Sequence, residues 1–62
     1  MKAAELKMKE DGELRELENQ LNEELFRLKI KHYTGQLQET HLLRETRRSI
    51  ARIKTILASR QA

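Results

Sequence analysis

The 62-residue chain contains no cysteine and no proline, and its only aromatic residues are one phenylalanine and one tyrosine. Without cysteine, neither a disulfide nor a cysteine-based zinc site can stabilise so small a domain. Charged residues make up 37% of the chain. A chain so rich in charge and so poor in aromatics is expected to be helical or disordered, and not a β-sheet protein.

Long hydrophobic runs are also missing. No apolar stretch approaches the ~20 residues that a membrane span needs, and the N-terminal sequence MKAAELKMKE lacks the hydrophobic segment of a signal peptide. We therefore expect a soluble protein of a reducing compartment, without a membrane partner.

Catalytic and metal-binding patterns are absent from the sequence as well. The two histidines, His32 and His41, do not have the spacing of an HExxH motif. There is no Ser/His/Asp set and no glycine-rich phosphate loop, and two helices enclose no cavity. We expect no metal, no cofactor, no small-molecule substrate and no enzymatic activity.

Charge is distributed unevenly along the chain. Residues 1–25 carry four basic and eight acidic side chains, a net charge of −4, whereas residues 26–62 carry nine basic and two acidic ones, a net charge of +7. A basic half of this kind favours a polyanionic partner, most often a nucleic acid.

Two apolar patterns with helical spacing define the expected core. The first is Leu14, Leu17, Leu21, Leu25 and Leu28, and the second is Leu43, Thr46, Ile50, Ile53 and Leu57. Both repeat every three or four residues, so each lies on one face of a helix. The residue numbers of the pairs 14 and 57, 21 and 50, 25 and 46, and 28 and 43 each sum to 71. The two faces therefore meet if the chain folds back on itself beside Gly35.

These patterns predict an all-α protein, an antiparallel two-helix hairpin with a short N-terminal helix, in a single domain spanning residues 1–62. The expected elements are helices at about 2–8, 12–33 and 40–59, with a turn at 34–39. Gly35 suits the left-handed conformation that ends a helix, and Thr40 and Asp11 suit the caps of the two long helices. A chain this short buries only about 60% of its unfolded surface, so we expect weak stability.

Smaller apolar groups are assigned structural roles. Met1, Leu6 and Met8 are expected to pack over the open end of the hairpin, near Leu14 and Leu57. Leu42 and Ile56 are expected to cover the line where the two helices meet.

The second long helix carries a basic face. Arg44, Arg48 and Arg52 are four residues apart and form a continuous ridge. The planar arginine fork can hold a phosphate through two N–H donors. The predicted RNA-binding residues are Lys31, Gln36, His41, Arg44, Arg47, Arg48, Arg52 and Lys54. The alternative is a solvated charged face, but only Glu45 is a nearby counter-ion within that helix.

A second apolar stripe, Phe26, Ile30, Tyr33 and Leu37, lies on the opposite face of the first long helix from Leu28. A two-helix hairpin cannot bury both faces of one helix, so this stripe is predicted to be a partner interface. A dimer contact or scattered surface residues are the alternatives.

The segment TGQLQETHLLRETRRSIARIKTIL, with MKAAEL at the start of the chain and EELFRLK in the first long helix, resembles the bacterial-type family of large-subunit ribosomal protein L29. Members of that family often have Ser or Thr where this chain has Glu10, and Phe or Met near Ile30. The resemblance implies a structural protein that binds large-subunit ribosomal RNA near the nascent-chain exit site, beside ribosomal protein L23. It also implies a bacterial ribosome in the cytoplasm, with an organellar ribosome as the alternative.

Two hypotheses about function follow. The first is a ribosomal RNA-binding protein, supported by this resemblance and by the basic ridge. The second is a coiled-coil adaptor that binds only protein, supported by the heptad pattern and the additional apolar stripe. Salt-dependent binding to ribosomal RNA would distinguish them.

Overall fold

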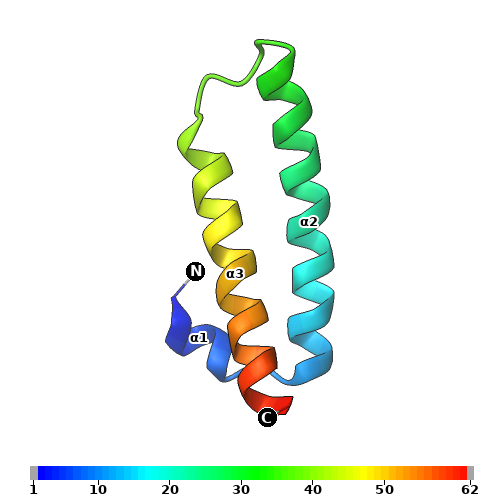
Figure 1. Cartoon of the computed structure of the whole chain (residues 1–62), viewed down its shortest axis with the longest axis vertical. Helices are drawn as coiled ribbons and strands as arrows, with labels where there is room; N and C mark the ends of the chain where they lie inside the picture. Colours follow the sequence, from blue (N-terminus) through cyan, green and yellow to red (C-terminus); the bar gives the residue numbers. More distant parts are fainter. Residues whose placement is uncertain (1, 62) are drawn as a thin grey trace.

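The computed structural model describes residues 2–61, which form a helical hairpin with a short helix at one end (Figure 1). The helices are α1 (Ala3–Lys7), α2 (Asp11–Tyr33) and α3 (His41–Gln61). The two long helices run antiparallel, side by side, and α1 lies against the C-terminal half of α3. The molecule measures 41 × 17 × 16 Å. The predicted all-α hairpin is confirmed.

Helix α2 ends in a Schellman motif around Gly35. The N–H of Gln36 donates to the carbonyl of Lys31 over 2.9 Å, and the N–H of Gly35 donates to that of His32 over 3.1 Å. Gly35 has a φ angle of +76°, as expected for this position. The hydroxyl of Thr34 donates to the carbonyls of Ile30 and Lys31, so little of the helix end is left unsatisfied.

The predicted seam between the long helices forms the core. Leu14, Leu21 and Leu28 of α2 are buried, and the buried residues of α3 are Thr46, Ser49, Ile50, Ile53, Ile56 and Leu57. Burial is graded along the hairpin. Leu14 and Ile53 are completely buried, Leu28 retains 9% of its exposure, and α2 has no buried residue beyond Leu28. The hairpin is therefore packed most tightly at the end that carries α1.

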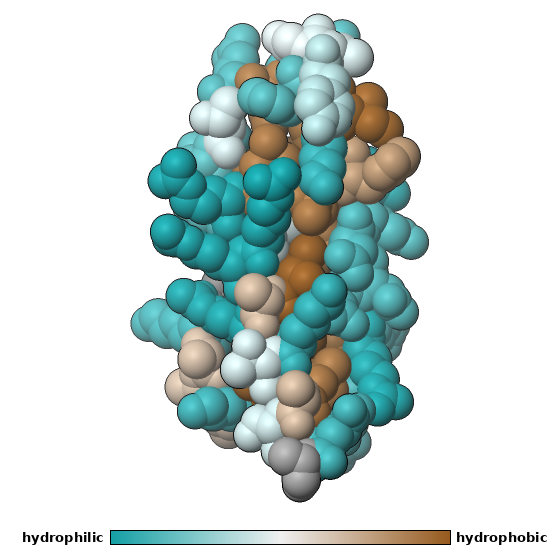
Figure 2. Space-filling model, viewed as in Figure 1, coloured by the Kyte–Doolittle hydropathy of each residue, from teal (hydrophilic) through white to brown (hydrophobic). Residues whose placement is uncertain are grey.

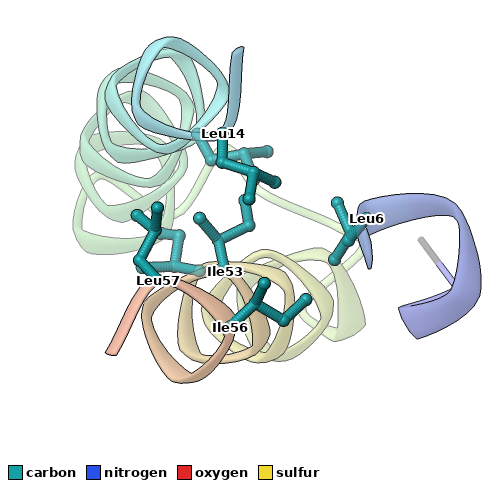
Figure 3. Packing of buried hydrophobic residues seen from close by; sticks show 7 residues of the cluster. Leu6, Leu14, Ile53, Ile56 and Leu57 are labelled. Atoms are coloured by element: carbon teal, nitrogen blue, oxygen red, sulfur yellow. The ribbon is translucent and has the colours of Figure 1, made fainter. Parts of the chain in front are cut away.

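Helix α1 closes that end with one leucine. Leu6 is 1% exposed and belongs to the same cluster as Leu14, Ile53, Ile56 and Leu57. Figure 3 shows Leu6 pointing from α1 toward Ile53 and Ile56, while Leu14 points across from α2. Leu6 thus packs as predicted, and Ile56 is buried, whereas Leu42 is only half-buried.

Two predictions at this end of the hairpin were wrong. Met8 is 88% exposed, because α1 already ends at Lys7 and Met8 follows it as the C-cap. Asp11 is the first residue of α2 rather than its cap; Glu10 holds the N-cap position, without a capping hydrogen bond from its side chain. The Asp11 carboxylate instead forms an ion pair with Arg60. Met1 lies outside the described residues.

Thr40 immediately precedes α3, where a cap was expected, and its backbone carbonyl accepts the first turn's hydrogen bond from the N–H of Leu43. Within residues 2–61, no helix is both long and apolar enough to span a membrane.

Candidate nucleic-acid interface

Three arginines of α3 line a shallow concavity near the loop end of the hairpin. Arg44, Arg47 and Arg48 are exposed, and each contributes to a depression of about 470 Å³. The remaining lining residues are Leu43 and Ala51 of α3, Thr40 just before α3, and His32 of α2. The α3 residues follow the three- and four-residue spacing of a single helix face. The depression is thus bounded by an arginine-bearing face of α3 on one side and by His32 on the other.

Arg48 also belongs to a second depression. Together with Glu45, Ser49 and Arg52 it lines a shallow hollow of about 320 Å³. Arg48 therefore connects Arg44 on one side with Arg52 on the other, as the predicted ridge requires. The structure brings these predicted residues together.

The other predicted RNA-binding residues are exposed but do not line either depression. Lys31 and Gln36 lie at the C-terminal end of α2 and in the turn, and His41 begins α3. Lys54 lies two turns beyond Arg47 on the same side of α3. These four side chains are exposed, but they do not line the two depressions formed by the arginines.

His32 was not among the predicted interface residues. It follows Leu28 by four positions and so continues the seam face of α2 by one more turn. Beyond Leu28 that face is no longer buried, which leaves His32 exposed beside the arginines of α3. The spacing from Leu28 was the signal that could have identified it.

The arginines of the concavity have no acidic partner. Arg44, Arg47 and Arg48 form no ion pair with a carboxylate anywhere in residues 2–61. Figure 2 shows a hydrophilic surface over the upper part of α3, on the left of the view. Three exposed guanidinium groups without counter-ions produce a local positive potential that attracts an external anion.

The apolar stripe on α2 is exposed. Phe26 retains 65% of its exposure, Ile30 48% and Tyr33 81%, while Leu37 in the loop is half-buried. Figure 2 shows hydrophobic atoms at the surface beside the upper part of α2, at the right edge of the view. The hairpin by itself leaves this surface open to solvent.

No group of three or more histidine and acidic side chains in residues 2–61 is placed to hold a metal ion. The depressions described above are open and shallow, and none contains a set of catalytic residues.

Comparison with known proteins assigns the chain to a family. The model of the family described as Ribosomal L29 protein matches residues 4–60, so it covers all of α2 and all but one residue each of α1 and α3. No solved structure matches the chain. The family consists of structural ribosomal proteins, not enzymes. The chain belongs to the ribosomal L29 family and is a structural protein of the large ribosomal subunit.

Proposed function

We propose that this protein binds large-subunit ribosomal RNA through the basic face of α3. The observation that carries the proposal is the set of exposed arginines, Arg44, Arg47 and Arg48, without a carboxylate partner in the described chain. An exposed arginine that has no carboxylate partner can bind a phosphate without first breaking an ion pair. Its guanidinium can hold the phosphate with two parallel hydrogen bonds.

The helix gives this face a fixed spacing. Successive members of the ridge, Arg44, Arg48 and Arg52, are four residues apart, which is about 6 Å along a helix axis. The buried side chains of α3 point toward α2 and α1. RNA can therefore approach the arginines without disturbing the core.

Ribosomal RNA is favoured over an arbitrary polyanion because the chain is a structural protein of the large subunit. The net charge of +7 in residues 26–62 matches the negative charge of the phosphate backbone, whereas the −4 of residues 1–25 opposes RNA contact. We infer that α3 and the loop end face the RNA, with the first half of α2 directed away from it.

The exposed stripe supports a second contact. Phe26, Ile30 and Tyr33 lie on the face of α2 turned away from α3. We propose that this stripe docks on a neighbouring ribosomal protein, L23, near the nascent-chain exit site of a bacterial ribosome. Aliphatic and aromatic side chains suit a protein neighbour. Because Phe26 is 65% and Ile30 48% exposed in the free hairpin, burial of the rest would contribute roughly 1–2 kcal/mol for Phe26 and about 1 kcal/mol for Ile30.

The RNA proposal is tested by salt titration of binding to purified large-subunit ribosomal RNA. The unchanged protein should lose affinity steeply as salt rises. Changing Arg44, Arg48 and Arg52 together to Ala should weaken binding by roughly 1 kcal/mol per residue and reduce the log–log salt slope by about three units. Arg15→Ala, on the acidic half of α2, is the control and should change neither quantity.

Circular dichroism should show the same helicity for all variants, because these side chains lie outside the buried cluster. The RNA proposal is wrong if the triple variant binds ribosomal RNA with unchanged affinity and unchanged salt slope.

A further inference from the structure

The concavity beside His32 lies where the hairpin seam opens. Leu28 is the last buried residue of α2, and Thr46 is the first buried residue of α3. Toward the loop, the seam face of α2 continues with His32 and that of α3 with the half-buried Leu43. Both line the depression of about 470 Å³. A surface depression therefore lies beside the loop end of the seam, between His32 of α2 and the arginine-bearing face of α3.

The lining of this depression has three chemical parts. Leu43 and Ala51 are apolar, His32 provides an aromatic ring, and Thr40 with Arg44, Arg47 and Arg48 provides hydrogen-bond donors. The His32 ring also forms a tilted pair with Tyr33, with 6.0 Å between the ring centroids. A site for phosphate alone would require only the donors. A nucleobase accounts for the apolar residues and the ring, and an attached phosphate accounts for the arginines.

We propose that this depression binds one unpaired nucleotide of RNA, with its base against His32 and Leu43 and its phosphate held by the arginines. The proposal rests on the RNA-binding function proposed above and specifies what that RNA must offer. The depression is open and shallow, so a base would lie against its lining without being enclosed. Bases within an A-form duplex stay stacked, so a base can enter only from a loop, a bulge or a single strand.

The arrangement assigns distinct roles to two side chains. Arg44 contributes to binding of any RNA, because it interacts with the phosphate backbone. His32 contributes only where a base is free to stack on its ring, since a paired base presents no open face. Loss of His32 should therefore reduce discrimination between RNAs, whereas loss of Arg44 should reduce affinity for all of them.

The test uses two synthetic RNA hairpins that are identical except for one bulged 2-aminopurine nucleotide. The unchanged protein should bind the bulged hairpin roughly tenfold more tightly than the paired one, and the fluorescence of 2-aminopurine should change on binding. His32→Ala should abolish this preference while leaving affinity for the paired hairpin unchanged. His32→Phe, which keeps an aromatic ring, should retain the preference.

Asn22→Ala is the matched control, an exposed position on α2 more than two turns from His32. It should behave like the unchanged protein. Two results would overturn the nucleotide site: equal affinity of the unchanged protein for both hairpins, or a preference for the bulged hairpin that survives His32→Ala. Either result would leave the general RNA-binding proposal standing. Failure to bind either hairpin or ribosomal RNA would refute the proposed function itself.

Discussion

The guanidinium of Arg60, in the last turn of α3, lies 2.8 Å from the carboxylate of Asp11, the first residue of α2. The same guanidinium donates to the carbonyl oxygens of Lys7 and Lys9, each over 2.8 Å. Lys7 ends α1, and Lys9 lies in the link between α1 and α2. One side chain therefore joins all three helices at the tightly packed end of the hairpin.

This contact predicts that Arg60→Gln loosens α1. The Asp11 carboxylate is about half-exposed, so the ion pair alone contributes little. The two bonds to backbone carbonyls involve a charged donor and contribute more. We expect a loss of about 1 kcal/mol in the free energy of unfolding, measured by urea denaturation, with faster amide hydrogen exchange in α1. Asp11→Asn, which keeps both carbonyl contacts, should cost less. Unchanged exchange rates in Arg60→Gln would show that Leu6 alone holds α1.

The two glycines should respond to alanine in opposite directions. At Gly35 a Cβ has free space, but the φ angle of +76° is strained for any residue with a side chain. Gly35→Ala should therefore cost about 1 kcal/mol. Gly12 lies in the first turn of α2, also with free space, and Gly12→Ala should stabilise the protein by about 0.5 kcal/mol. Thermal denaturation of the two variants measures both effects. Stabilisation by Gly35→Ala would contradict the turn geometry.

Ile53 is completely buried at the centre of the cluster. Ile53→Ala should cost about 2–5 kcal/mol, and Ile53→Val about 0.5–1.5 kcal/mol. A domain of this size has only about 3–5 kcal/mol of core stabilisation. We therefore expect the alanine variant to be largely unfolded at 25 °C by circular dichroism, and the valine variant to remain folded with a lower Tm. A folded alanine variant with an unchanged Tm would mean that the core tolerates a cavity there.

Phe26→Ser combined with Ile30→Ser tests the exposed stripe. Both side chains lie outside the buried cluster, so the helicity of the free protein should change little. Incorporation into large subunits should fall markedly, measured by co-sedimentation after a salt wash. Lys29→Ser, between the two positions, serves as the control and should incorporate normally. A collapse of helicity in the double variant would mean that the stripe supports the fold of the free protein.

Sequence periodicity predicted the hairpin because the two leucine- and isoleucine-bearing faces can be buried only against each other. Gly35 located the turn, since a left-handed helix end favours glycine. The periodicity also distinguished the buried residues of α3 from its exposed arginines, because an amphipathic helix carries apolar and charged residues on opposite faces.

Features that depend on contacts between helices, or on where a helix or its burial ends, were not predicted. The Arg60 contact joins positions 49 residues apart and leaves no periodic signal. The end of α1 at Lys7, which exposes Met8, differs from the expected end by a single residue, and helix ends are the least certain part of a pattern. The spacing from Leu28 places His32 on the seam face of α2, but the apolar pattern does not show that burial of this face ends at Leu28 and leaves His32 exposed.

The graded burial along the hairpin has a consequence for folding. The best-packed layer joins Leu14 to Ile53 and Leu6. It can form only after the roughly 40 residues between Leu14 and Ile53 have closed into a loop. The weakly packed turn region does not offset the chain entropy lost in that closure. The hairpin should therefore fold in one cooperative step, and not by pairing of the helices turn by turn from Gly35. Under native conditions the loop end, with fewer buried contacts, should open first and most often. The part of the chain proposed to contact RNA is thus also the part that an RNA surface can most readily reshape.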